Sequence, residues 1–410
     1  MFLTRRAFGF GLTATVLTGC GPAPRAGTSS VSIWRAAPNP GFDAWIQGFR
    51  GRALAAGISG NTVAAGLRGV GYLPTVVERD RNQTEFKRSL EDYLAIAASQ
   101  ERVATGRTKL REFASTLAAI ERRHGVEARV ICAIWGLESR YGARRGDVPV
   151  ISALATLAYD GRRGAFFEKQ LIAALKIIQR GDITTDRMRG SWAGAMGHTQ
   201  FIPTSYQAFA VDFTGDGKRD IWSDDPTDAL ASAAAYLSRN GWQRGKPWGG
   251  EVRLPASYSG PYGRAARQSI TSLRQAGVTL ANGNPLPQSL GSAGILIPAG
   301  RSGPAFAVSS NFGVILRYNN AENYAIGIGH LSDRIAGGGA IRGDFGPDAY
   351  GLTLPERKDL QRGLNRAGFD VGDADGVLGR KTEAAIRAYQ RASGLAETGK
   401  PSPALLARLR

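Results

Sequence analysis

Apolar residues recur at helical spacing through most of the chain before residue 245. Intervals of three and four predict amphipathic helices, and several of the segments end at a glycine, which is a common helix stop. The predicted helices cover residues 42–57, 108–125, 126–142, 162–181 and 228–241. We therefore expect a mainly α-helical body between about residues 40 and 245.

The pattern changes after residue 247, where short apolar runs alternate with glycine, proline and serine. Such runs are typical of β-strands, and they cover residues 251–255, 293–300, 305–310 and 311–319. We expect a small, partly β subdomain attached to the helical body. A glycine-rich linker at 337–351 then leads to a compact helical unit over residues 352–410.

Segment 126–142 is apolar on most faces, which predicts a central, buried helix. It carries one carboxylate near its end, Glu138. Burial disfavours the charged form of a carboxyl and raises its pKa, and a glycosidase general acid needs such an environment to hold a proton near neutral pH. The alternative is a salt bridge at the helix end from Glu138 to Arg140, Arg144 or Arg145.

The chain has a formal net charge of +18 at pH 7. Such a charge favours a polyanionic partner, either nucleic acid, an anionic membrane or a cell-wall polymer. Arg5 and Arg6 precede a short apolar run, which is the pattern of an export signal and looks like a twin-arginine signal. Because an exported protein does not normally meet nucleic acid, we expect a wall polymer or a lipid surface as the partner.

Residues 17–20, LTGC, resemble a bacterial lipobox in which Cys20 receives the lipid. The resemblance implies a signal peptide over residues 1–19, a flexible tether over 20–39 and a periplasmic protein held by a lipid anchor. Gly21 gives no indication of inner-membrane retention, so we expect the outer membrane. The alternative is an ordinary signal with an incidental cysteine. Cys132 lies in an apolar run, which predicts an inert core residue.

Further motifs accompany Glu138 along the chain. They are GLESRYG at 136–142, GSWAGAMGHTQFIPTSY at 190–206, VDFTGDGKRDIW at 211–222, AAYLSRNGW at 234–242 and ILRYNNAENYA at 315–325. Together and in this order they resemble the lytic murein transglycosylases of the membrane-bound B type. The resemblance implies a lysozyme-like catalytic domain, which we place at residues 40–345, that cleaves the β-1,4 bond between N-acetylmuramic acid and N-acetylglucosamine in peptidoglycan.

By this resemblance, Glu138 is the catalytic glutamate. It is expected to protonate the glycosidic oxygen and then to take the proton of the muramic acid 6-hydroxyl, which closes a 1,6-anhydro ring without water. Ordinary glycosidases use two carboxylates, whereas the N-acetyl group of the substrate is expected to stabilise the developing charge here, and no cofactor is required. Two alternatives stay open: a lysozyme-type hydrolase that uses water, and a non-catalytic protein that binds the wall.

Six further residues match sugar-binding positions of the family. Ser191 is suited to hydrogen-bond the substrate N-acetyl group or Glu138, with a helix N-cap as its alternative role, and Tyr236 is either a cleft or a core residue. His198 stands where many members carry an aromatic residue, which we interpret as local variation. The six are Ser191, Gln200, Tyr236, Tyr318, Asn319 and Tyr324.

Residues 212–223 have the spacing of an EF-hand calcium loop, and related enzymes of this type have such a site. Position twelve departs from the pattern because Ser223 replaces the bidentate glutamate, and Asp228 could supply that carboxylate. The alternative is a turn without metal. The candidate ligands of a structural Ca²⁺ are Asp212, Thr214, Asp216, Lys218 through its carbonyl, Asp220 and Asp228.

Residues 352–410 resemble the small three-helix peptidoglycan-binding domain of type 1. The match includes Leu360, Gln361, Gly376, Thr382 and Gln390. Such a domain is expected to hold the enzyme on its polymer and to raise the local concentration of substrate.

Overall fold

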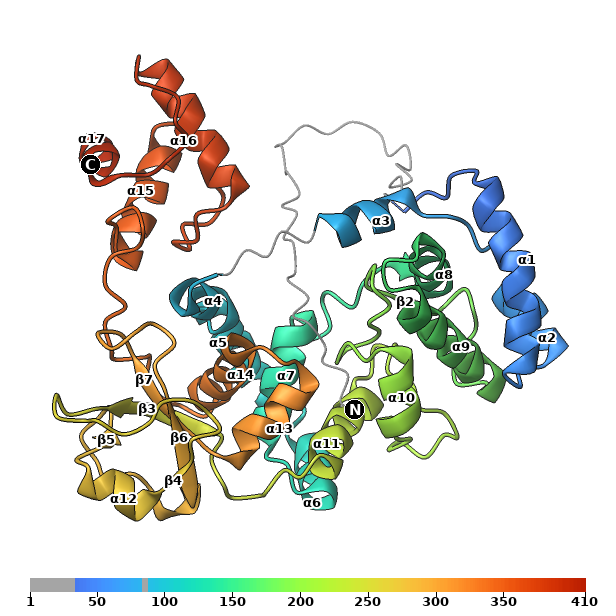
Figure 1. Ribbon diagram of the computed structural model, residues 1–410, viewed down its shortest axis with the longest axis horizontal. Helices are drawn as coiled ribbons and strands as arrows, with labels where there is room; N and C mark the ends of the chain where they lie inside the picture. Colours follow the sequence, from blue (N-terminus) through green and yellow to red (C-terminus); the bar gives the residue numbers. More distant parts are fainter. Residues whose placement is uncertain (1–33, 83–87) are drawn as a thin grey trace. The chain divides into compact units, whose positions relative to one another are not determined.

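The computed structural model describes residues 34–82 and 88–410, which form two compact units (Figure 1). One unit contains residues 34–82 and 104–244, and the other contains 88–103 and 245–410. The predicted signal peptide, Cys20 and the start of the predicted tether lie outside the described residues. Within the described ranges, every helix is too short or too polar to cross a membrane.

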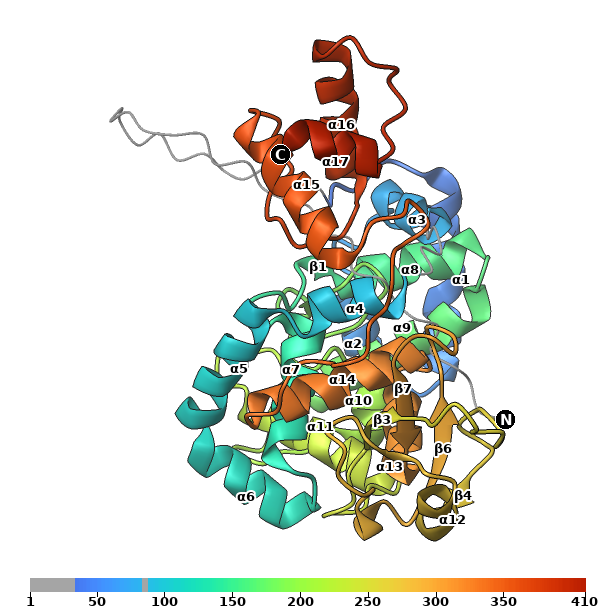
Figure 2. The same ribbon diagram turned by 90° about the vertical axis from the view of Figure 1, so that its left-hand side faces the viewer.

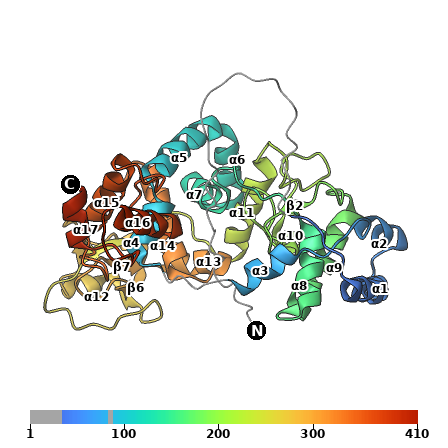
Figure 3. The same ribbon diagram turned by 90° about the horizontal axis from the view of Figure 1, so that it is seen from above.

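The first of these units is almost entirely helical. Helices α8 and α9 pack side by side, and α1 and α2 lie against them (Figure 3). Its elements are α1 (Pro40–Ala55), α2 (Gly60–Gly66), α3 (Pro74–Arg81), α6 (Ala114–His124), α7 (Ala128–Ser139), α8 (Val150–Asp160), α9 (Gly164–Arg180), α10 (Pro203–Phe209), α11 (Thr227–Arg239) and the short strands β1 (Val148–Pro149) and β2 (Arg189–Gly190). Helix α5 (Gln100–Glu112) begins in the other unit and ends in this one.

Helix α7 is the central helix that the sequence predicted. Every residue from Val130 to Gly136 is buried, and the helix packs against α6 and α11. Helix α11 is lined with alanines whose small side chains allow close packing, and all its residues from Asp228 to Leu237 are buried. A helix that buries nearly its whole surface holds any residue at its end in a fixed position.

The second unit contains a five-stranded antiparallel sheet in the order β4-β6-β7-β3-β5. Its register pairs Val252 with Ala305 and Leu296 with Phe306. Helix α14 packs against β3, α13 and α4. The elements are α4 (Leu90–Ala97), β3 (Gly249–Arg253), β4 (Gln268–Ser269), α12 (Ile270–Gln275), β5 (Thr279–Leu280), a 3₁₀ turn at Gln288–Leu290, β6 (Ser292–Leu296), β7 (Ala305–Val308), α13 (Ser310–Tyr318) and α14 (Glu322–Ile335).

Two sequence predictions about elements were wrong. Residues 311–319 form helix α13 rather than a strand, because Ser309 caps the N-terminus through its side chain and Phe312, Ile315 and Leu316 repeat at helical intervals on the buried side. The predicted helix 108–125 is broken at Phe113 into α5 and α6. The strands at 251–255, 293–300 and 305–310 are confirmed as β3, β6 and β7.

The C-terminal segment forms a bundle of three helices, α15 (Leu354–Arg366), α16 (Arg380–Ala392) and α17 (Pro403–Leu409) (Figure 2). Thr353 and Glu356 form a capping box at the start of α15. Leu360, Ile386 and Leu406 belong to a core of its own. The predicted three-helix unit is therefore confirmed.

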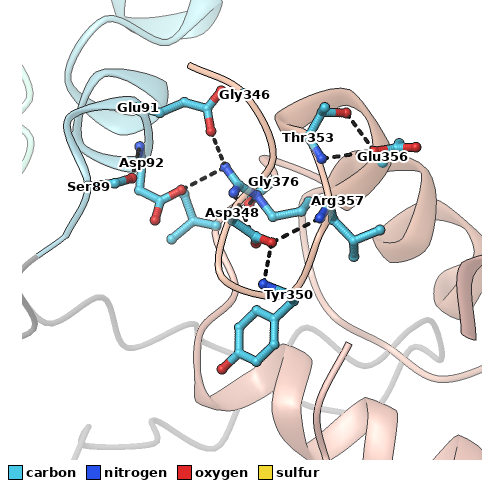
Figure 4. Close-up of polar contacts among 12 residues, drawn as sticks. Ser89, Glu91, Asp92, Gly346, Asp348, Tyr350, Thr353, Glu356, Arg357 and Gly376 are labelled. Carbon is cyan, nitrogen blue, oxygen red and sulfur yellow. Dashed lines mark hydrogen bonds and ion pairs between the residues drawn. The ribbon is translucent and has the colours of Figure 1, made fainter. Parts of the chain in front are cut away.

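An ion cluster joins α15 to α4 within this unit (Figure 4). The side chain of Arg357 is 3% exposed, and its Nη2 lies 2.6 Å from Glu91 Oε2 and 2.9 Å from Asp92 Oδ1. Its Nη1 lies 3.1 Å from Asp348 Oδ2, while Nε donates to the carbonyl oxygen of Gly376. We call Arg357 and these three carboxylates the Arg357 cluster.

Candidate active site

Glu138 lies in the last turn of α7 and is half-buried. The helix ends at Arg140, whose φ of 49° is left-handed, and Tyr141 follows with a φ of 56°. Among the described residues, the third non-glycine residue with a positive φ is Gln200, at 53°. Non-glycine residues in this region cost energy and cluster at functional sites, so the strain of this unit is concentrated around the end of α7.

The loop after α7 lies against the segment that contains Ser191. Strands β1 and β2 pair Val148 with Gly190, and a Cβ on Gly146 would lie 2.7 Å from the backbone nitrogen of Ser191. The Ser191 hydroxyl accepts a hydrogen bond from the Ala195 N–H at 3.0 Å, within a turn. No helix begins there, so the alternative role of Ser191 as a helix N-cap is wrong.

Gln200 contacts the same loop from the other side. Its side chain is 5% exposed, and Nε2 donates to the carbonyl oxygens of Arg145 at 3.0 Å and Gly197 at 2.8 Å. Both amide protons therefore hold main chain in place. Contact between Gln200 and sugar stays a prediction, and the carbonyl oxygen of its side chain is the atom that would make it.

The guanidinium of Arg145, one of the alternative partners of Glu138, contacts residues 222–224. Its guanidinium donates to the carbonyl oxygens of Trp222 and Ser223 and pairs with Asp224 at 2.8 Å. This arrangement ties the loop after α7 to residues 222–224, at the end of the EF-hand-like spacing. Sequence reasoning missed it because the partners lie more than seventy positions apart and the acceptors are main-chain carbonyls.

Tyr236 is 7% exposed and lies in the helical core. Its ring centroid is 4.5 Å from that of Phe209 and 6.0 Å from that of Phe201. These contacts account for the residue as a packing group, which favours the core alternative over a role in sugar binding. The aromatic residues Phe201, Tyr206 and Trp135 are also buried, and none of them is more than 2% exposed.

The three remaining predicted residues lie in the second unit, where α13 meets α14. The rings of Tyr318 and Tyr324 are parallel within 10°, with centroids 6.5 Å apart. Between them in the chain, Asn319 has a buried Oδ1 without a hydrogen-bond partner in the described structure. A buried carbonyl oxygen that lacks a donor is costly, and an amide N–H of a ligand would satisfy it.

The acidic motif brings three of its six predicted ligands together. Ligand oxygens of Asp212, Asp216 and Asp228 all lie within 4.8 Å of one another. We call residues 212–228 the acid loop. Asp228 therefore lies close enough to supply the carboxylate that position twelve lacks, and its role as a ligand stays a prediction. Asp220 is outside this group, because its Oδ1 accepts hydrogen bonds from the N–H groups of Trp222 and Ser223.

Backbone N–H groups surround these carboxylates. Asp228 is 3% exposed and accepts from the N–H groups of Phe213, Thr214 and Asp220. Burial raises the pKa of Asp228 in spite of these bonds. At Asp212, burial acts in the same direction, but N–H bonds, chiefly from Gly215 and Gly217, bring the pKa below its ordinary value. Hard carboxylate oxygens in a preformed loop fit a calcium ion.

Cys132 is fully buried in α7, and its thiol contacts the carbonyl oxygen of Gly106 at 3.4 Å. Burial raises the pKa of this thiol to about 12. A thiol that stays protonated is a poor nucleophile. The prediction of an inert core cysteine is confirmed.

Comparison with known proteins decides the family. A model of the transglycosylase SLT domain matches residues 41–333, and a model of the peptidoglycan binding domain matches residues 353–409. The chain belongs to the SLT transglycosylase family. This confirms the resemblance that the motifs around Glu138 indicated.

Several relatives within the SLT family are solved or characterised. The chain is 47% identical to SltB3 from Pseudomonas aeruginosa, solved in complex with NAG-NAM-pentapeptide, with a TM-score of 0.73 over 91% of this chain and 100% of that chain. It is 27% identical to the Escherichia coli lytic transglycosylase Slt35, solved in complex with calcium, with a TM-score of 0.61 over 76% of this chain and 98% of that one.

The membrane-bound lytic murein transglycosylase B of Escherichia coli strain K12 is 33% identical over 217 residues. The match covers 52% of this chain and 58% of that relative, so the chain spans less than two thirds of its length. The predicted lysozyme-like helical fold with a small sheet agrees with the solved SLT structures.

Proposed function

We propose that this protein is a lytic transglycosylase that cleaves the β-1,4 bond between N-acetylmuramic acid and N-acetylglucosamine in peptidoglycan. The observation that carries the proposal is the setting of Glu138. One half-buried carboxylate ends an otherwise buried helix, and all the positive-φ non-glycine residues of the described chain adjoin that end or the loop that packs on it. Such a carboxylate serves in turn as acid and as base.

In this mechanism, protonated Glu138 gives its proton to the glycosidic oxygen, and the bond to the muramic acid C1 breaks. The resulting carboxylate then takes the proton of the 6-hydroxyl of the same sugar, whose oxygen attacks C1 and forms the 1,6-anhydro ring. Glu138 ends in its starting protonation state, so the cycle needs neither water nor a cofactor. The N-acetyl group of the substrate stabilises the charge that develops at C1.

The remaining residues supply binding rather than proton transfer. The unpartnered Oδ1 of Asn319 is suited to accept the N–H of an N-acetyl group, and the parallel rings of Tyr318 and Tyr324 are suited to line the sugar face. The hydroxyl of Ser191 carries one proton that its bond with Ala195 leaves available for donation. These roles are tested by the loss of affinity for chitin-type oligosaccharides in the alanine variants.

Two assignments of location belong to the same proposal. Residues 40–345 act as the catalytic domain and residues 352–410 bind the wall polymer, which keeps the enzyme near its substrate. The protein works in the periplasm, held by lipid on Cys20 at the outer membrane. The name of the E. coli relative, which describes a membrane-bound enzyme, supports a membrane-associated protein. Release of the protein from membranes by Cys20→Ala tests the anchor.

A structural calcium ion fits the acid loop. Asp212, Asp216 and Asp228 would supply carboxylate oxygens, and Thr214 and the carbonyl of Lys218 would complete the loop ligands. The ion would neutralise the carboxylates and fix the loop, with no part in proton transfer. The calcium complex of Slt35 supports this assignment.

Digestion of purified sacculi tests the activity. We expect the full-length protein in detergent to release muropeptides one water lighter than lysozyme products, and Glu138→Gln to lose at least 100-fold of the rate, since acid–base groups contribute ~10²–10⁴-fold. Products at full mass would establish a hydrolase. Sacculus binding without soluble products from either protein would establish a non-catalytic wall-binding protein.

A further inference from the structure

His198 lies between helix α7 and Ser223 of the acid loop. The indole Nε1–H of Trp135 donates to His198 Nδ1 at 3.0 Å. His198 Nε2 lies 2.7 Å from the carbonyl oxygen of Ser223. Indole is only a donor, so Nδ1 accepts and is unprotonated. Nε2 carries the proton, which the Ser223 carbonyl accepts at 2.7 Å, while the guanidinium Nη1 of Arg145 lies farther away, at 3.2 Å from Nε2. The imidazole is therefore held as one neutral tautomer, and its lone pair is unavailable to act as a base.

The main chain of His198 makes a second contact with α7. Its carbonyl oxygen accepts from Ser139 Oγ at 2.6 Å, and the same Oγ accepts from the N–H of Gly142 at 3.0 Å. Trp135 precedes Glu138 by three positions and Ser139 follows it directly. One residue from another segment thus holds helix α7 one turn before Glu138 and immediately after it.

Gly142 shows how closely the imidazole approaches the end of α7. A Cβ at this position would lie 2.6 Å from both Cε1 and Nδ1 of His198, and the φ of Gly142 is 88°. The chain therefore needs glycine here for both space and conformation. The ring of His198 and the turn after Glu138 are fitted to each other.

The far side of His198 is anchored on a rigid segment. Ser223 O receives Arg145 Nη1 at 2.6 Å as well as the imidazole, and the N–H of Ser223 is bound by Asp220 Oδ1 at 3.0 Å. The N–H of Asp220 is in turn bound by the buried Asp228 at 3.0 Å. These bonds connect the acid loop to the end of α7 through His198 and Arg145.

We propose that His198 is a positioning residue that fixes Glu138 by linking Trp135 and Ser139 to the segment that ends the acid loop. This inference rests on the proposed function for the role of Glu138. His198 acts through α7 and touches no reacting atom. It follows that the imidazole of His198 serves through its two hydrogen bonds, to Trp135 and to Ser223.

Kinetics on a soluble muropeptide chain test the proposal. His198→Phe keeps a planar ring but leaves the Trp135 N–H and the Ser223 carbonyl without their partner. We expect kcat to fall 10- to 100-fold, since misplacing a catalytic group by about 1 Å costs on the order of 10²-fold, with KM changed less than twofold. His198→Gln, whose amide offers both a donor and an acceptor, should recover part of the loss. Trp135→Phe should lower kcat in the same direction.

Trp242→Phe is the matched control. Trp242 Nε1 donates to Glu127 Oε2 at 2.7 Å, so this variant loses an indole hydrogen bond at the opposite end of the same helix. Its kcat should stay within twofold of the wild type at a temperature where all variants are folded. Equal losses in Trp242→Phe and His198→Phe would reduce His198 to a stability residue and overturn the proposal, as would an unchanged kcat in His198→Phe.

Hydrogen exchange followed by mass spectrometry separates this inference from the proposed function. In the full chain, His198→Phe and His198→Gln should accelerate exchange over residues 135–145, whereas Trp242→Phe should leave that segment unchanged. If the wild type released no products, the proposed function would fail, while faster exchange confined to this segment would still support the link through His198. Unchanged exchange in both His198 variants would overturn it.

Discussion

Two groups of three carboxylates lie in different units of this molecule, and they are satisfied in different ways. In the Arg357 cluster, a guanidinium that is 3% exposed pairs with all three. In the acid loop, ligand oxygens of Asp212, Asp216 and Asp228 lie within 4.8 Å of one another, and apart from the Thr214 hydroxyl at Asp212 their hydrogen-bond donors are backbone N–H groups. The three carboxylates of the Arg357 cluster therefore lie beside a full positive charge, whereas those of the acid loop lie beside the partial positive charges of backbone N–H groups.

The difference indicates what each cluster is for. A buried arginine with carboxylate partners completes its own hydrogen bonding and contributes to the docking of one element on another. Backbone dipoles orient carboxylates but leave their net negative charge, which a divalent cation can neutralise. The Arg357 cluster is thus a structural contact between α15 and α4, while the uncompensated charge of the acid loop agrees with the calcium ion that we propose there.

The largest effect should come from removing the arginine. Arg357→Met leaves three carboxylates around an apolar side chain, and breaking a buried ion pair from one side costs about 3–5 kcal/mol. We expect a loss of that order in the free energy of unfolding of the C-terminal bundle, measured by urea denaturation of the full chain. The control is Arg362→Met on the same helix, whose side chain is 53% exposed and pairs with Asp359.

The control should lose less than about 1 kcal/mol, because exposed ion pairs contribute little. Similar losses from Arg357→Met and Arg362→Met would contradict the view that burial makes the Arg357 cluster structural.

The next effect should come from adding calcium. Ligand that binds only the folded state stabilises it by about 2.7 kcal/mol at one hundred times its Kd. We expect CaCl₂ to raise the Tm of chelator-treated protein, with heat of binding in calorimetry, and an equal concentration of MgCl₂ to do less because Mg²⁺ prefers a smaller octahedral site. The same CaCl₂ titration should raise the Tm of Arg357→Met and of the wild type by equal amounts. Absence of both heat and Tm change with CaCl₂ would remove the metal from the acid loop.

A smaller effect should follow from neutralising Asp228. Asp228→Asn replaces one acceptor oxygen by an NH₂ group that faces backbone donors, and hydrogen bonds to charged groups contribute about 1.5–3 kcal/mol. We expect a loss of about that size without calcium, together with loss of the calcium response. Asp225→Asn is the matched control, since Asp225 is exposed and its carboxylate accepts hydrogen bonds from the N–H and the hydroxyl of Thr227. A wild-type calcium response in Asp228→Asn would exclude Asp228 as a ligand.

The two clusters also differ in how well the sequence predicted them. The acid loop is local, so the spacing from Asp212 to Asp220 indicated a cation loop, and Asp228 was within reach of the same motif. The Arg357 cluster joins residues 265 and 266 positions apart, and no local pattern records such a contact. The same limit applies to His198, whose partners Trp135 and Ser223 lie 63 and 25 positions away.

The helical body, the buried α7 and the C-terminal bundle could be predicted because each follows from periodic burial within one segment. Helix α13 was mistaken for a strand because its apolar run is short and is bounded by glycine and serine signals. Such a run fits both the helical and the strand repeat, and only the N-cap at Ser309 favours the helix. The place of Glu138 near the end of a buried helix could be predicted from the apolar segment around it, while its catalytic role, which the family resemblance implied, stays a prediction. The strain at Arg140 and Gln200 could not, since it depends on tertiary contacts.

The smallest expected effect is the pH dependence of the free energy of unfolding that arises from Glu91 in the Arg357 cluster. Burial raises the pKa of Glu91, although the hydrogen bond and the charge of Arg357 oppose the shift. The folded state therefore binds this proton more tightly than the unfolded state does. The resulting stabilisation is fully present below the ordinary pKa of 4.5 and is lost as pH rises through the raised value.

The stability contribution of His330, on the neighbouring helix α14, depends on pH in the opposite direction. Burial lowers the pKa of His330 to about 4, so this contribution to the free energy of unfolding is lost as pH falls below 6.5. Glu91→Gln isolates the first component. Urea unfolding between pH 4 and pH 7 should give a wild-type minus variant difference in free energy that declines steadily as pH rises. A difference that grows with pH would mean that Arg357 outweighs burial at Glu91, and the cluster would then be held chiefly by charge rather than tolerated in spite of desolvation.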